Sequence, residues 1–568
     1  MTHMPEPFSR LPLPLASVFE RIGLAGGPAP ATVTFERATA WKQLVEDYRP
    51  VAQSLEWQLA RLAWNREGVD LFADGNVPYL VNNNGLLSAD AAAVLFANCE
   101  EAGPAEAPIR VLELGAGSGL FARYFLDEFR DLCRRGSRDF YDRLRYCVTD
   151  GSIRTIEQWH ERGIFQDHAE HVVACALDAS APDSAGPARA VFCNYVLDVL
   201  PMAFVRRTAE GWQQLFVRTW IPDDEAVLRQ YTALSVDEIR ARAGSGEPDA
   251  LSELLPLLPL LECEADFLPA GENALPGLAA LEDIGGGAPF AYNYGAIGCL
   301  ESLERLLENH GFVLIADYGP EQPEGPAGHL PGQRFGPAVA AVVNLPLLEL
   351  HCRRRGLEFW EPEGDATRLT HARLLSRGGL PQTRRVFESR FRAAALGEAE
   401  ALVQQATQQA AAGLLRQALA SYRAAIERNP RNWLAIGQAA AFVAAQLRDP
   451  ATGLELARAA IELNPWYSPY LWNVLGDCLS ALERARDAQE CYMQAYRIRP
   501  ADAETNLRLA GSCLQTGDPA RSLEAVARGL ANDSDAMLRH DLLQRQQQAI
   551  DALSRRWNGE RAAAARRR

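Results

Sequence analysis

The chain has 568 residues, of which 48% are hydrophobic and 23% are charged, which is the composition of a soluble globular protein with roughly three to four domain-sized units. The formal net charge of −16 argues against general nucleic-acid binding, because a phosphate backbone would be repelled. The eleven cysteines include no CxxC pair and lie largely in apolar runs, so we expect reduced thiols in a cytoplasmic protein, with neither disulfides nor a zinc or other metal site. No apolar run approaches the ~18 residues of a membrane span, so no membrane association is expected.

The first hundred residues precede the main sheet. Residues 1–37 are rich in proline and glycine, which predicts a poorly ordered leader. Apolar residues recur at helical spacing from Trp41 to Trp64, so we interpret residues 38–100 as an amino-terminal helical lobe. Ser88 to Asp90 can cap a second helix in this lobe.

The stretch from Val111 to Phe121, VLELGAGSGLF, organises the next segment, residues 101–392. It predicts a buried parallel strand, a tight glycine turn and a helix, which together form a cofactor-binding crevice. Glycine suits this turn because its backbone tolerates positive φ and lets a ligand approach closely. A dinucleotide fingerprint would need a further glycine where this chain has Leu120, so the pyrophosphate interpretation is disfavoured.

Acidic residues end the two strands expected next. Asp150 would accept hydrogen bonds from ribose hydroxyls, although it could equally cap the helix that follows. Asp178 would suit an adenine amino group, with a turn-forming aspartate as the alternative.

The fourth and fifth strands bring polar groups to the point where the winding of the sheet reverses. Asn194 and Asp198 would face the reactive end of the cofactor, and Asp317 ends the neighbouring strand. Asp198 and Asp317 are therefore the candidate catalytic carboxylates. The alternative for Asp198 is a helix cap with no part in the chemistry.

Several further elements are expected around this crevice. Residues 204–220 predict a hairpin, and the apolar runs 251–261 and 275–281 predict insertions over the crevice. An amphipathic helix from Tyr294 should end at a glycine C-cap, Gly311. The proline- and glycine-rich residues 320–337 are long enough to act as a lid.

These motifs, in order, resemble the MidA-like class I S-adenosylmethionine (SAM) methyltransferases. The resemblance covers roughly residues 80–375 and includes an α/β Rossmann-like domain with a doubly wound, mostly parallel sheet. The family includes the mitochondrial complex I assembly factor that methylates an arginine side chain. The resemblance implies SAM as the cofactor, held by the residues at the carboxyl ends of the strands: Glu113, Gly115, Ala116, Gly117, Gly119, Asp150, Asp178 and Asn194.

Two positions depart from the family pattern. Tyr195 stands where the family has an acid, and Asn344 stands where it has an aspartate. A guanidinium needs carboxylates to hold and deprotonate it, so these departures argue against carrying arginine over as the acceptor.

The last third of the chain repeats. Pro430, Pro465 and Pro500 are spaced 35 residues apart and each closes a similar run. Small and aromatic residues follow tetratricopeptide (TPR) spacing, so residues 396–535 predict an all-α TPR solenoid. Residues 536–568 would be a capping helix with a basic tail.

The leading interpretation is a SAM-dependent methyltransferase that acts on a protein side chain, with the concave TPR face recruiting a protein or peptide partner. The alternative is a non-catalytic assembly or scaffold protein that retains a SAM-binding fold, which Tyr195 favours. A nicotinamide oxidoreductase would require a glycine in place of Leu120.

Overall fold

The structure is a computed structural model that describes residues 42–73, 83–103, 107–271, 275–277, 289–319, 332–335, 338–363, 370–533 and 535–566. The chain divides into two compact units. The first comprises residues 1–71, 76–82 and 87–394, and the second comprises residues 72–75, 83–86 and 395–568.

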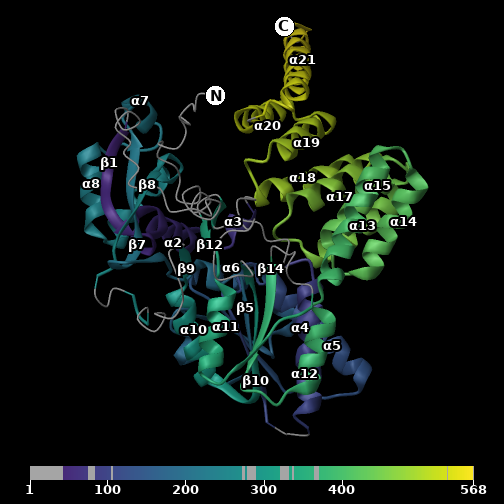
Figure 1. Cartoon of the computed structure of the whole chain (residues 1–568). Coiled ribbons are helices and arrows are strands. Elements are labelled where there is room, and N and C mark those ends of the chain that lie inside the picture. The colour runs from purple at the N-terminus through teal and green to yellow at the C-terminus, as the bar shows by residue number, and fades with distance from the viewer. Residues whose placement is uncertain are drawn as a thin grey trace, which may run out of the picture. The chain divides into compact units, whose positions relative to one another are not determined.

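A seven-stranded sheet forms the centre of the first unit (Figure 1). Its order is β13-β14-β10-β5-β2-β3-β4, and all pairs are parallel except those of β14 with β10 and β13. The strands are β2 (Ile109–Leu114), β3 (Leu144–Asp150), β4 (Val172–Ala176), β5 (Ala188–Asn194), β10 (Leu307–Tyr318), β13 (Glu358–Trp360) and β14 (Thr370–Ser376). The predicted doubly wound, mostly parallel sheet is thus confirmed, and its winding reverses between β2 and β5.

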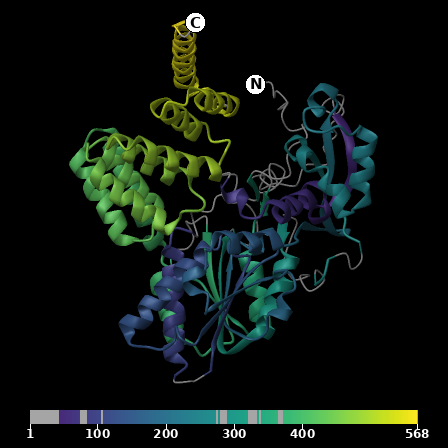
Figure 2. The same ribbon diagram turned by 180° about the vertical axis from the view of Figure 1, so that it is seen from behind.

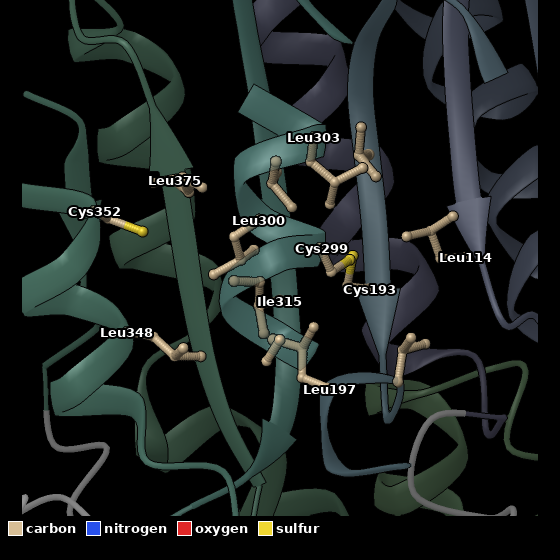
Figure 3. Packing of buried hydrophobic residues seen from close by; sticks show 14 of the residues in the cluster. Leu114, Cys193, Leu197, Cys299, Leu300, Leu303, Ile315, Leu348, Cys352 and Leu375 are labelled. Carbon is tan, nitrogen blue, oxygen red and sulfur yellow. The ribbon is translucent and has the colours of Figure 1, made fainter. Parts of the chain in front are cut away.

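Helices cover both faces of this sheet (Figures 1 and 2). On one face lie α10 (Tyr294–Leu306) and α11 (Leu345–Arg354), and on the other lie α4 (Leu86–Glu101), α5 (Leu120–Gly136) and α12 (Pro381–Arg390). The core under α10 and α11 is apolar, and in Figure 3 Cys299 of α10 points toward Cys193 of β5. On the opposite face the rings of Phe125 and Phe192 pack with centroids 5.0 Å apart. Burial on both faces explains why the strand sequences are almost continuously apolar.

A second, five-stranded sheet belongs to the same unit. It contains β1 (Lys42–Pro50), β6 (Ala203–Thr208), β7 (Gly211–Pro222), β8 (Glu262–Pro269) and β9 (Phe290–Tyr292). The predicted hairpin of residues 204–220 is confirmed as β6 and β7. Near it in the chain are α2 (Leu55–Glu67), α7 (Glu225–Leu228), α8 (Val236–Ser245) and α9 (Pro248–Ser252), and α3 (Asp70–Ala73) spans the division between the two units.

The helix predicted from Trp41 to Trp64 is wrong in its first half. Residues Lys42–Pro50 form β1, which pairs antiparallel with β7, and α2 begins only at Leu55. Register shifts on both sides of Glu46 interrupt the alternation of side chains in β1. The bulges make a strand resemble a helix in the pattern of its apolar residues.

Three smaller expectations are also corrected. Ser88 is no cap, because α4 begins at Leu86 and the Ser88 hydroxyl donates to the Phe121 carbonyl at 3.0 Å. Gly311 lies within β10 rather than after a helix, because α10 ends at Leu306. The apolar run 251–261 packs into the core of the second sheet instead of covering the crevice.

Some expectations lie partly or wholly outside the described residues. These are the leader 1–37 and most of the runs 275–281 and 320–337. The strand β11 (Gly332–Phe335) lies within the last run and pairs with β12 (Ala338–Ala341), which follows the run. The remaining short 3₁₀ helices are Val51–Gln53, Gln166–His168, Pro182–Ala185, Leu197–Val199 (η5) and Leu255–Leu260. The helix α6 (Ile153–Arg162) lies between β3 and β4.

The second unit is a run of helices. They are α13 (Ala393–Ala411), α14 (Leu415–Arg428), α15 (Trp433–Ala445), α16 (Pro450–Leu463), α17 (Pro469–Ala481), α18 (Ala485–Ile498), α19 (Ala503–Gln515), α20 (Pro519–Asn532) and α21 (Arg539–Arg566). Glycine allows close packing within a pair, since a Cβ on Gly476 would lie 2.4 Å from the Tyr492 ring. Among the helices of the described residues, none is long and apolar enough to cross a membrane.

Candidate functional site

The glycine turn between β2 and α5 uses the left-handed backbone that only glycine adopts freely. Gly115, Gly117 and Gly119 have φ of 57°, 52° and 76°. The turn is held by the Ala116 amide, which donates to the Thr149 carbonyl at 2.8 Å. The three predicted glycines therefore share one conformational requirement at the carboxyl end of β2.

Asp150 ends β3 beside this turn and is 2% exposed. It accepts hydrogen bonds from the Gly117 amide at 3.1 Å, from the Ser152 amide at 2.9 Å and from the Trp64 indole at 3.1 Å. Burial raises the pKa of Asp150, while these hydrogen bonds oppose the rise. The cap of α6 is Ser152, whose side chain accepts from the Thr155 amide, so the alternative of Asp150 as that cap is wrong.

Glu113 lies one strand position from the turn, on β2. The Tyr146 hydroxyl donates to its Oε2 at 2.7 Å. Burial raises the pKa of Glu113 to about 8, the Tyr146 hydrogen bond lowers it, and the negative charge of Asp150 raises it further. Glu113 is thus a buried group tied to its neighbouring strand.

Asn194 and Asp198 follow one another at the carboxyl end of β5, where the winding reverses. Their side chains are 5% and 3% exposed. Three side-chain atoms here have no hydrogen-bond partner within the described part of the chain: Nδ2 and Oδ1 of Asn194, and Oδ1 of Asp198. Buried polar atoms of this kind are costly unless a ligand satisfies them, so the residues fit a bound polar group.

Asp317 is fully buried and lies beside Asp198. Its two oxygens accept from the backbone amides of Leu197 at 2.9 Å and Tyr318 at 2.8 Å, which fixes the η5 turn. Burial raises the pKa of Asp317 to about 7, against the lowering effect of these amides. Burial first, and then the charge of Asp317, raise the pKa of Asp198 well above its usual value.

Two tyrosines border these carboxyl groups and were not predicted as site residues. Tyr195 has φ of 54°, which is unusual for a tyrosine, and its amide donates to the Ala316 carbonyl at 2.8 Å. Its ring lies 4.7 Å from that of Tyr318 between centroids. Burial and the charges of Asp198 and Asp317 raise the pKa of Tyr318.

Asp178 is not brought into this group by any contact that the structure shows. It is exposed, and its Oδ1 accepts from the Ser180 amide at 2.8 Å and the Ser180 hydroxyl at 2.7 Å. This is the turn-forming arrangement given above as its alternative. Asn344 caps α11, because its side chain accepts from the Leu347 amide at 3.2 Å.

Sequence reasoning missed two tryptophans that hold the site together. Trp64 reaches Asp150 from α2, and the Trp159 indole donates to the Gly117 carbonyl at 2.9 Å. Trp159 lies in α6 and is 1% exposed, but no local pattern in the sequence marks its contact with the turn. No group of three or more metal-ligating side chains occurs within the described residues.

Comparison with known proteins identifies the family of the domain that contains this site. Residues 91–336 match the sequence model of a family described as "Putative S-adenosyl-L-methionine-dependent methyltransferase". Those residues form a domain of that family. The family's cofactor is SAM, as predicted, and the methyltransferase domain is followed by a TPR region, because residues 469–502 match the tetratricopeptide repeat.

Solved structures also resemble parts of the chain. A candidate methyl transferase from Burkholderia thailandensis bound to S-adenosyl-homocysteine is 16% identical, covers 67% of this chain and 97% of its own, and has a TM-score of 0.39. A thermophilic TPR protein from Thermus thermophilus is 22% identical, covers 30% of this chain and 89% of its own, and has a TM-score of 0.24. None of the curated proteins compared with the chain matches it.

Proposed function

We propose that the methyltransferase domain transfers a methyl group from SAM to a nucleophile on a protein side chain, and that the TPR region recruits the protein. The observation that carries this proposal is the buried, unpartnered amide of Asn194 at the carboxyl end of β5. It lies where the winding of the sheet reverses, which is where ligands bind in folds of this type. A scaffold without a ligand would leave this amide unsatisfied.

The residues proposed to hold SAM surround the glycine turn. Gly115, Ala116, Gly117 and Gly119 supply a backbone without bulky side chains, and Asn194 supplies a donor and an acceptor. Asp150 is proposed to hold the ribose through its remaining acceptor capacity. Glu113 on β2 and Asp178, which follows β4, are proposed to belong to the same SAM-binding site.

The chemistry that SAM supplies when bound is an electrophilic methyl group. The chain must align a nucleophile with it and take the proton that the nucleophile loses. Asp198 is the proposed base, because its Oδ1 has no partner among the described residues. Asp317 is proposed to assist, because, in addition to burial, its negative charge raises the pKa of the neighbouring Asp198 and so favours proton uptake there.

The TPR region supports a protein substrate, because stacked helical repeats present an extended surface that suits peptides. The net charge of −16 points in the same direction, since it disfavours a nucleic acid as the acceptor. The domain and the repeats thus divide chemistry and recruitment between them.

The first test is cofactor binding by calorimetry. The purified protein should bind SAM and not NAD. Gly117→Leu should lose SAM binding, because a side chain would be forced into positive φ beside the ligand. Gly151→Ala is the matched control: Gly151 is a neighbouring glycine with nothing within 4 Å of an added Cβ, so this variant should bind normally.

The second test is transfer of labelled methyl from SAM into the proteins of a cell extract. Asp198→Asn should lower the rate by about 10² to 10³ while SAM affinity stays unchanged. If the wild type binds SAM but transfers no methyl group, the scaffold alternative is favoured. The presence of Tyr195 in place of an acid is the sequence feature that supports this alternative. Binding of NAD instead of SAM would refute both interpretations.

A further inference from the structure

The last helix, α21, carries an apolar face that the repeats do not cover. Its first half packs against them, where Leu542 and Ala549 are fully buried. A Cβ on Gly529 of α20 would lie 2.6 Å from Leu542, which shows how tightly this half packs. The helix then extends beyond α19 and α20 (Figure 1).

Large apolar side chains that are partly exposed lie along one side of α21, next to the side that packs against the repeats. Leu543 is 46% exposed, Ile550 is 44% exposed and Trp557 is 63% exposed. They recur every seven residues, and the half-buried Leu553 lies between the last two. A seven-residue spacing is typical of the seam along which one helix packs against another, and apolar residues that adjoin one another at a surface mark an interaction site more than single ones do.

The net positive charge of α21 favours a negatively charged partner helix. The helix contains six arginines and three acidic residues, hence a charge of +3, whereas the whole chain carries −16. Arg555 and Arg556 are exposed beside Trp557. Two copies of α21 would therefore repel each other, and charges that flank such a seam decide which helices pair.

The apolar side chains form a narrow line rather than a broad face. A bilayer surface favours a wide apolar face, whereas a single helix needs only such a line. We infer that α21 binds an acidic amphipathic helix of another protein, with Leu543, Ile550 and Trp557 as the seam. This surface shares no residue with the proposed SAM site, so the inference stands whether or not the domain methylates a protein.

Binding of a synthetic peptide to the full-length protein tests this inference. The peptide has four heptads with leucine at the two seam positions and glutamate at the flanking positions, and its counterpart has lysine in place of glutamate. Fluorescence anisotropy should show binding of the acidic peptide only. Trp557→Ser and Arg555→Glu should each weaken it by about tenfold or more.

Gln548→Ser is the matched control, because Gln548 is exposed on the same helix but off the seam, and binding should not change. Circular dichroism should show equal helix content in all variants, since these side chains are exposed. The inference is overturned if the lysine peptide binds equally well, if neither peptide binds, or if Trp557→Ser has no effect. It is also overturned if the seam supports self-association in sedimentation, or binding to phosphatidylserine vesicles but not to the acidic peptide.

Discussion

The indole of Trp64 donates a hydrogen bond to Asp150 Oδ1 at 3.1 Å and so joins α2 to the end of β3. We predict that Trp64→Phe lowers the free energy of unfolding by about 1 to 2 kcal/mol, because a buried carboxylate loses one of its donors. SAM affinity should fall severalfold, since Asp150 would be held less firmly. Thermal unfolding and calorimetry measure the two effects, and Trp557→Phe on the exposed face of α21 is the control. Unchanged values for both quantities would contradict the role given to Trp64.

Asp317 should affect both stability and chemistry. Asp317→Asn leaves a single acceptor oxygen for the backbone amides of Leu197 and Tyr318, which should cost about 1 to 3 kcal/mol of stability. It also removes the charge that raises the pKa of Asp198. The pH profile of methyl transfer should therefore shift to lower pH, which a purely structural role would not produce. Initial rates between pH 5 and 9 measure the shift.

Stability should fall as pH rises through neutrality. Burial raises the pKa of Glu46 from 4.5 to about 7 and that of Glu113 from 4.5 to about 8. In both cases the folded state binds the proton more tightly than the unfolded state. The contribution is thus fully present below pH 4.5 and is lost as pH rises to about 8.

Thermal midpoints measured across this range test the sign. Glu113→Gln should flatten the fall, because glutamine does not ionise. A stability that rises from pH 5 to 8 would contradict the prediction.

Two glycines of the repeats should respond in opposite ways to alanine. A Cβ on Gly476 would lie 2.4 Å from the Tyr492 ring, so Gly476→Ala should destabilise the second unit by about 1 to 3 kcal/mol. On Gly511 the nearest atom would lie 3.5 Å away, so Gly511→Ala should be neutral or stabilising by up to ~1 kcal/mol. Urea unfolding followed by circular dichroism measures both. Equal effects would mean that packing at Gly476 does not matter.

The central strand, glycine turn and helix were predictable because their signal is local. The apolar run of β2, the spacing of Gly115 to Gly119 and the start of α5 all lie within a dozen residues. The repeats were predictable for a different reason, since the same pattern recurs at a fixed period. Both signals are read without knowing any distant contact.

The elements that were missed depend on distant contacts. The strand β1 exists because Lys42 to Pro50 pair with Phe216 to Pro222, and bulges disguise its alternation. The hydrogen bond from Trp64 joins residues 86 positions apart. Likewise, the closeness of Asp198 and Asp317 could be inferred from sheet topology, whereas their division of hydrogen bonds could not.

The second unit takes one of its pieces from early in the chain. The Trp433 indole donates to the Asn83 carbonyl at 2.9 Å, and the side-chain amide of Asn429 donates to the Asn84 carbonyl at 2.9 Å. During synthesis at about 5 to 20 residues per second, the two carbonyls would wait roughly 20 to 70 s for their donors to leave the ribosome. The segment from the end of α14 to the start of α15, which carries both donors, therefore completes these hydrogen bonds late in translation, long after residues 83–86 have emerged.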